Sequence, residues 1–159
     1  MTPSTTPAAD LEGQSAFMRL LRVHFDQARG DRVAGWFEVG ADHHQPWGLV
    51  HGGVFTAVIE TFATAGAYEA VKDRGQLAVG VTNVTDFLRP QREGRLNVVA
   101  EPIQQGRTQQ LWQVVITRAE DGKAVARGQV RLQNSRRPPS LEQRRPTSAP
   151  PAGPHPGWL

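Results

Sequence analysis

The stretch "HGGVFTAVIETFAT", residues 51–64, has the composition of a buried helix, yet it carries a single charged side chain, Glu60, near its middle. Two glycines follow the histidine, and apolar residues fill most of the remaining positions. We predict a long helix over residues 53–73 that is ended by Gly75, because glycine adopts the left-handed backbone that stops helices. A carboxylate in the middle of such a helix requires a reason.

The polar residues of this helix fall on one line. Thr56, Glu60 and Thr64 are spaced by four residues, so they form a narrow polar stripe on an otherwise apolar surface. One interpretation is that the stripe faces water, as in an amphipathic surface helix. The other is that it faces a cleft or a subunit boundary, where partial desolvation would increase the basicity of the carboxylate. The helix pattern alone leaves both interpretations open.

The start of the helix predicts a second polar feature. Gly52 and Gly53 allow close approach to the backbone, and the first N–H groups of a helix lack internal acceptors. Such groups can hold a carbonyl oxygen and stabilise negative charge on it. Glu60 lies two turns further along, roughly 11 Å away. Two antiparallel copies of the helix would bring both features to one small carbonyl, so this geometry favours a dimer with shared sites.

The segments around this helix predict an α+β fold. The long helix precedes four strand-like segments joined by short connections with turn signals such as "EG" and "DG". The simplest arrangement is an antiparallel sheet that curls around the helix. We expect a short helix over residues 15–22 with Ser15 as its cap, and strands over residues 23–28, 32–40, 77–88, 95–106, 110–119 and 124–133.

Composition predicts one domain with two polar ends. We expect residues 1–13 to be a disordered N-terminus, residues 14–135 to form the domain, and residues 136–159 to be a disordered tail rich in proline and arginine. The tail accounts for the net charge of +3, since the rest has 14 basic and 14 acidic residues. This distribution argues against nucleic-acid binding. With no cysteine, no membrane-spanning segment and no signal peptide pattern, a cytoplasmic protein is expected.

Four segments carry a resemblance to a known family: "HHQPWGLVHGGVFTAVIETFAT" (43–64), "FLRPQREGRL" (87–96), "QQGRTQQLWQV" (104–114) and "EDGKAVARGQV" (120–130). Together they resemble the hotdog-fold acyl-CoA thioesterases. The most similar branch contains the 4-hydroxybenzoyl-CoA, phenylacetyl-CoA and dihydroxynaphthoyl-CoA thioesterases. The resemblance implies a curved antiparallel sheet wrapped around one central helix. It also implies homodimers, often paired into homotetramers, that hydrolyse acyl-CoA, with an aromatic or medium-chain acyl group expected here.

The resemblance also implies roles for individual residues. Glu60 resembles the catalytic carboxylate, acting as general base or as nucleophile, and the Gly52 N–H resembles the group that polarises the thioester carbonyl. Gln45 and His51 resemble the polar pair near that carbonyl and the leaving thiolate. Thr64 resembles the hydroxyl that helps to place the water.

The expected contacts to CoA are less specific. Gly53 belongs to the glycine pair at the helix start, while Arg89, Arg107 and Thr108 resemble positions that contact CoA phosphates; Arg137 is a weaker candidate. No cofactor is expected, because CoA is part of the substrate. A metal at the "DHHQ" segment and His51 is disfavoured, since no established ligand spacing is present.

Two other functions remain open at this point. One is a non-catalytic acyl-CoA-binding or regulatory protein with the same fold, and the other is an enoyl-thioester hydratase. The chain has no GxSxG, P-loop or dinucleotide fingerprint, which disfavours serine hydrolases, NTPases and Rossmann enzymes. Trp47 and Phe62 are expected to pack in the core rather than contact an acyl group.

Overall fold

The structure, a computed structural model, describes residues 15–136. It contains a short helix, a long helix and six strands, together with two turns of 3₁₀-helix. In chain order these are α2 (Ala16–Leu21), β1 (Val23–Arg29), β2 (Arg32–Val39), η1 (Ala41–His43), α3 (Gly52–Glu69), η2 (Lys72–Arg74), β3 (Gln76–Phe87), β4 (Gly94–Gln105), β5 (Gln109–Arg118) and β6 (Ala124–Arg136). Over these residues, no helix combines the length and apolar composition needed to cross a bilayer.

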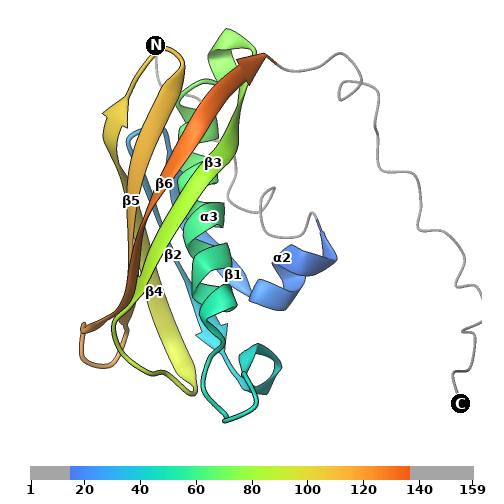
Figure 1. Ribbon diagram of the computed structural model, residues 1–159, viewed down its shortest axis with the longest axis vertical. Helices are drawn as coiled ribbons and strands as arrows, with labels where there is room; N and C mark the ends of the chain where they lie inside the picture. The colour runs from blue at the N-terminus through green and yellow to red at the C-terminus, as the bar shows by residue number, and fades with distance from the viewer. Residues whose placement is uncertain (1–14, 137–159) are drawn as a thin grey trace, which may run out of the picture.

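The six strands form one antiparallel sheet in the order β1-β2-β4-β5-β6-β3. The sheet curves around α3, which runs along its inner face (Figure 1). Gly122 turns the chain between β5 and β6 with a φ of 69°, a backbone conformation that favours glycine. This arrangement confirms the predicted α+β architecture of a curved sheet around one central helix.

The helix α3 packs closely against the inner face of the sheet. The Phe62 ring stacks on Phe25 of β1, with ring centroids 4.6 Å apart. A Cβ placed on Gly66 would lie 2.4 Å from the Trp112 ring of β5, so only glycine permits this approach. Phe62 and Trp112 are both fully buried. These contacts fix the position of α3, and therefore of Glu60, relative to the strands.

The predicted short helix is confirmed as α2. The Ser15 hydroxyl accepts a hydrogen bond from the Met18 N–H at 3.2 Å, which caps the helix. At the other end, the buried His43 ring lies 2.7 Å from the Leu20 carbonyl oxygen through its Nε2 atom. His43 therefore joins the loop before α3 to the end of α2.

The predicted boundaries of the long helix were wrong at its C-terminal end. The α-helix stops at Glu69 rather than at residue 73. The Val71 N–H donates to the Tyr68 carbonyl, while the Ala67 carbonyl accepts a hydrogen bond from the Gln110 side chain at 3.0 Å. Gly75, with a φ of 68°, ends the following 3₁₀ turn. The predicted stop at Gly75 is thus confirmed, but a different type of helix ends there.

The chain ends lie almost entirely outside the described residues. The predicted N-terminal segment 1–13 and the tail beyond Arg136, including Arg137, belong to this part. Arg136 itself was predicted to start the tail, yet it is the last residue of β6 and pairs with Gln76 of β3. The last strand is therefore three residues longer than the predicted segment 124–133.

A β-bulge changes which side chains of β3 face the helix. The register of β3 against β6 shifts between Gly80 and Thr82. Before the shift, Ala78 and Gly80 lie toward α3; after it, Asn83 and Phe87 do. A bulge inserts one residue and so reverses the alternation of side chains along the strand. Strict alternation from Gly80 would instead place Thr82 toward α3.

The edge strand β3 presents apolar side chains to solvent. It pairs with β6 on one side and has no neighbouring strand on the other within the described chain. Val79, Val81 and Val84 are 51%, 56% and 61% exposed. A long edge with exposed valines is a surface to which another strand can add. This edge lies directly beside the part of α3 that carries Glu60.

Candidate active site

The carboxylate of Glu60 is half-buried between α3 and β3. Its Oε2 atom accepts a hydrogen bond from Asn83 Nδ2 at 3.0 Å. A Cβ placed on Gly80 would lie 2.1 Å from the other oxygen, Oε1, so the carboxylate occupies the space left by the missing side chain of Gly80. The polar stripe of α3 therefore does not simply face water, because its central residue lies against the edge strand.

The residues that flank Glu60 on the stripe are also half-buried. The Thr56 hydroxyl donates to the Gly52 carbonyl at 3.2 Å, one turn earlier on the helix. Thr64 lies one turn after Glu60 and so shares its face. The helix therefore places Thr64 on the same face as Glu60.

The first turn of α3 has one N–H group left for a ligand. The His51 side chain accepts a hydrogen bond from the Gly53 N–H at its Nδ1 atom, at 2.8 Å. The His51 carbonyl accepts from the Val54 N–H at 2.9 Å. Among the described residues, no acceptor pairs with the Gly52 N–H. His51 therefore accepts hydrogen bonds from the N–H groups of Gly53 and Val54, and the Gly52 N–H remains as a donor at the positive end of the helix dipole.

The Phe87 ring covers one side of this helix start. A Cβ placed on Gly52 would lie 2.8 Å from the tip of that ring, and Phe87 is itself 58% exposed. Glycine at position 52 therefore permits contact between the end of β3 and the first turn of α3.

The loop before α3 turns back on itself at Gln45. The Gln45 N–H donates to the Leu49 carbonyl at 2.8 Å, and the Gln45 side-chain oxygen accepts from the Trp47 N–H. The His51 N–H donates to the His43 carbonyl at 2.8 Å, so the segment just before Gln45 pairs with the residue that caps α3, while the Gln45 amide oxygen is engaged by Trp47. Trp47 is 79% exposed, so its predicted core position was wrong, because the loop turns it outward.

His43 and His44 have structural contacts. His43 is buried against α2, and the His44 ring lies 2.6 Å from the Arg92 carbonyl through Nε2. Within residues 15–136, no group of three or more His, Asp or Glu side chains is arranged to hold a metal ion.

The residues predicted to contact CoA lie at opposite ends of the sheet. Arg89 is exposed, and its backbone N–H donates to Val125 near the start of β6. Arg107 and Thr108 form the turn between β4 and β5, beside Asn134 near the end of β6. Along β6, the two places are marked by Val125 and Asn134, which are nine residues apart. At 3.3 Å per residue this separation is about 30 Å. One copy of the chain does not bring the three residues together.

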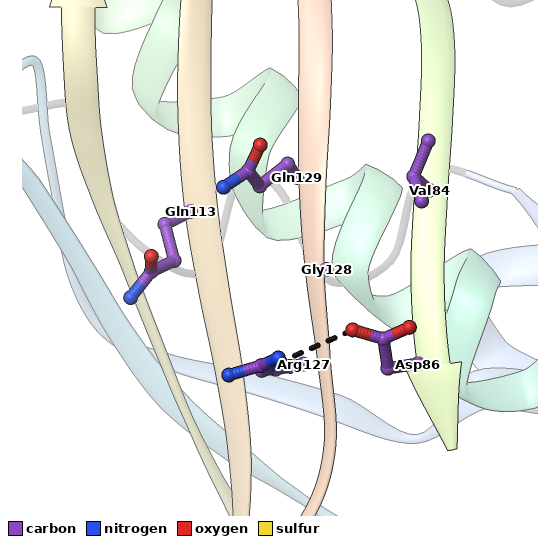
Figure 2. Close-up of a pocket in the computed structure, with 6 residues that line it drawn as sticks. All are labelled: Val84, Asp86, Gln113, Arg127, Gly128 and Gln129. Carbon is purple, nitrogen blue, oxygen red and sulfur yellow. Dashed lines mark hydrogen bonds and ion pairs between the residues drawn. The ribbon is translucent and has the colours of Figure 1, made fainter.

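A hollow of about 380 Å³ lies on the other face of the sheet. Arg127 and Asp86 form an ion pair there, with Arg127 Nε 3.3 Å from Asp86 Oδ2 (Figure 2). Figure 2 shows these side chains in front of the strands and α3 behind them, so this hollow does not contain Glu60. It is lined by Val84, Asp86, Gln113, Arg127, Gly128 and Gln129.

Known proteins have similar sequences and the same fold. A family model described as "Thioesterase superfamily" matches residues 48–125. "Putative esterase Rv1847" of Mycobacterium tuberculosis is 40% identical over 136 residues, which cover 84% of this chain and 96% of that protein. Its solved structure superposes with a TM-score of 0.74 and covers 78% of this chain and 100% of the other.

Two further relatives extend this picture. The crystal structure of S. sahachiroi AziG superposes with a TM-score of 0.73, and its sequence is 42% identical to this one. The match covers 77% of this chain and 98% of the AziG chain. "Proofreading thioesterase EntH" of Cronobacter turicensis is 29% identical over 112 residues, which cover 70% of this chain and 81% of that protein. The chain belongs to the thioesterase superfamily and has its hotdog fold. This membership supports hydrolysis of a thioester as the general reaction.

Sequence reasoning missed Gly80 and Asn83, the two residues that contact the Glu60 carboxylate from β3. The sequence does not mark Asn83, because the bulge that turns it toward α3 has no turn motif or proline to indicate it. A glycine inside a strand pattern is the one available signal, since it often marks a bulge or a close approach.

Proposed function

We propose that this protein hydrolyses acyl-CoA thioesters with aromatic or medium-chain acyl groups to the free acid and CoA. The observation that carries the proposal is the half-buried Glu60 carboxylate, held by Asn83 on a helix whose first free N–H belongs to Gly52. A base or nucleophile and a donor for a carbonyl oxygen are the two groups that thioester hydrolysis needs. CoA is part of the substrate, and this chemistry requires no cofactor.

The reaction balances by either of two routes. In the first, Glu60 takes a proton from water as the water oxygen bonds to the carbonyl carbon. In the second, Glu60 attacks that carbon and forms a mixed anhydride, which water then opens. In both routes the Gly52 N–H stabilises the negative carbonyl oxygen, the C–S bond breaks, and CoA leaves as the thiolate.

Three polar side chains complete the proposed site. His51 accepts a hydrogen bond at Nδ1, so in its neutral form the ring carries its proton on Nε2 and can donate it. The Gln45 side-chain amide group supplies a second donor near the carbonyl and the leaving thiolate. Thr64, one turn beyond Glu60, helps to place the attacking water.

We propose further that two copies of the chain share each site. Glu60 and Gly52 are eight residues apart on one helix, roughly 12 Å at 1.5 Å per residue, which is too far for one small carbonyl. A second copy added at the exposed edge of β3 would supply the missing group. The positions of Arg89 and Arg107 support shared sites. These arginines lie at opposite ends of the sheet in one copy, so a single CoA would contact both only if each came from a different copy. Homodimers and pairs of dimers both satisfy this requirement.

The first test is hydrolysis of a panel of benzoyl-, hydroxybenzoyl-, phenylacetyl-, naphthoyl- and fatty-acyl-CoA esters, with thiol release as the measurement. We expect activity in the wild type and a fall of about 10²-fold or more in kcat for Glu60→Ala. Glu38→Ala is the matched control, since it makes the same substitution at a glutamate that is exposed on β2. Binding of CoA esters without turnover by the wild type would refute the enzymatic proposal and favour a binding protein.

The role of the Gly52 N–H can be tested with one pair of variants. Gly52→Pro removes this donor at the first position of the helix, where proline is well tolerated. His51 has φ −64° and ψ 133°, which is compatible with a following proline. Gly52→Ala keeps the N–H and adds a similar carbon against Phe87. We expect kcat to be about 10²- to 10³-fold lower for the proline than for the alanine variant, and equal values would exclude this role.

Shared sites can be tested by mixing inactive subunits. In a dimer of Glu60→Ala with Gly52→Pro, one site lacks both groups and the other has both intact. Random exchange between equal amounts should therefore restore about a quarter of the wild-type sites, given two-fold symmetry. Sites contained within one chain would restore no activity. Sedimentation analysis of the same mixtures checks that dimers form.

A further inference from the structure

The bulge in β3 places an amide against the carboxylate of Glu60. Asn83 Nδ2 donates to Glu60 Oε2 at 3.0 Å and to the Thr56 carbonyl oxygen at 3.1 Å. Both partners are oxygen atoms that accept hydrogen bonds, so the NH₂ end of the amide faces them. One side chain of β3 therefore contacts α3 at Glu60 and, one turn earlier, at the helix backbone.

A third contact holds the other end of this amide. The Thr85 hydroxyl donates to Asn83 Oδ1 at 2.8 Å. If the amide rotated by half a turn, its oxygen would face the Glu60 carboxylate and the Thr56 carbonyl, and its NH₂ would face the Thr85 hydroxyl. Two acceptor pairs would then repel. Because a hydroxyl can also accept, the two acceptors on α3 select the orientation that donates to Glu60, and the Thr85 hydroxyl adds a hydrogen bond that holds the other end of the amide.

The hydrogen bond from Asn83 distinguishes the two oxygens of the carboxylate. Oε2 is occupied by the amide, whereas Oε1, beside Gly80, accepts no hydrogen bond from the described residues. A neutral amide holds the group without adding charge beside it. Oε1 is therefore the oxygen left for a proton of water or for the thioester carbon.

We propose that Asn83 is a positioning residue for thioester hydrolysis, and that Thr85 acts through it. Asn83 limits the rotation of the Glu60 side chain and presents Oε1 to the substrate. Fixing a reacting group in this way contributes to the rate, because a displacement of about 1 Å can cost about 10²-fold. This inference rests on the proposed function of Glu60, and it assigns to two residues of β3 a role in the same reaction.

The test compares kcat and KM for four variants on the best thioester substrate. Asn83→Ala and the near-isosteric Asn83→Asp both remove the donor, and we expect kcat to fall about tenfold or more while KM changes little. Thr85→Val removes the hydroxyl at constant shape and should lower kcat in the same direction. Thr85→Ser restores the hydroxyl and should keep kcat near the wild-type value.

Gln129→Ala is the matched control, because it truncates an exposed amide of the neighbouring strand β6. Thermal melting of every variant detects loss of folding, and Thr85→Val keeps the test valid if Asn83→Ala does not fold. A purely structural role predicts lower melting temperatures with kcat unchanged, which would overturn the inference while leaving the role of Glu60 intact. A wild-type protein inactive on every thioester would overturn the proposed function and this inference together.

Discussion

Gly80 is the position where one added carbon should most directly displace the catalytic carboxylate. In Gly80→Ala, the new Cβ would lie 2.1 Å from Glu60 Oε1 and 3.2 Å from its Cδ. Contacts with a Cβ are essentially never shorter than 3.0 Å, so the carboxylate must retreat by about 0.9 Å. Because the clashing atom ends a flexible side chain, the side chain is expected to move rather than the strand.

This displacement predicts a large effect on rate and a small one on stability. A shift of about 1 Å in a reacting group can cost about 10²-fold, so kcat should fall by roughly that factor. Replacing glycine by alanine within a strand removes an entropic penalty of about 0.5–1 kcal/mol. The variant should therefore melt at or slightly above the wild-type temperature despite its lower activity.

The assay is thiol release under saturating acyl-CoA, with thermal melting of the same preparations. Gly40→Ala is the matched control, since its nearest neighbour would be Arg22 Nη1 at an ordinary 3.5 Å and its φ is −157°. The control should keep the wild-type kcat. Wild-type kcat in Gly80→Ala would refute the reasoning, because the carboxylate would then tolerate the displacement.

Three further predictions concern stability. Gly66→Ala places a Cβ 2.4 Å from the Trp112 ring and should lower the unfolding free energy by about 1–3 kcal/mol in urea titrations. Asn134→Ala removes a buried side chain that donates to two carbonyls of the β4–β5 turn, with an expected loss of about 1–3 kcal/mol by the same method. The Lys123 backbone N–H holds the pKa of Asp121 below its usual range. The ionised Asp121 side chain therefore stabilises the folded protein at pH values above the ordinary pKa of aspartate, and this stabilisation is lost as the pH falls through the lowered pKa. Asp121→Asn should accordingly reduce the melting temperature at neutral pH but not in strong acid.

The sequence predicts the elements well because their ends are determined locally. Ser15 caps α2 through its own hydroxyl, Gly75 adopts the left-handed backbone after the long helix, and Gly122 turns the chain between two strands. Each depends on the conformational preference of one residue. The family followed from the resemblance rather than from such local preferences, and the order of the strands in the sheet was not predicted.

The misplaced end of the long helix shows where local preferences are insufficient. The Ala67 carbonyl accepts a hydrogen bond from the side chain of Gln110, which lies 43 residues further along the chain. The same buried side chain also donates from Nε2 to Asn134 Oδ1 at 2.8 Å. Buried polar groups need such partners, but a single sequence does not indicate which distant residues will provide them. The same holds for Asn83, since its contact with Glu60 depends on a bulge that the alternation of β3 does not predict.

The position of Glu60 explains why an apolar helix carries a charge at its middle. The first turn of α3 is occupied by the cap and the Gly52 donor, and its later turns pack against Trp112 and the sheet. Only the middle of the helix lies beside the bulge of an edge strand, where Gly80 provides space and Asn83 provides a donor. If a second copy adds to that edge, as proposed, the strand that positions Glu60 also brings in the partner's helix start. Assembly of the dimer and completion of the site would then be the same event.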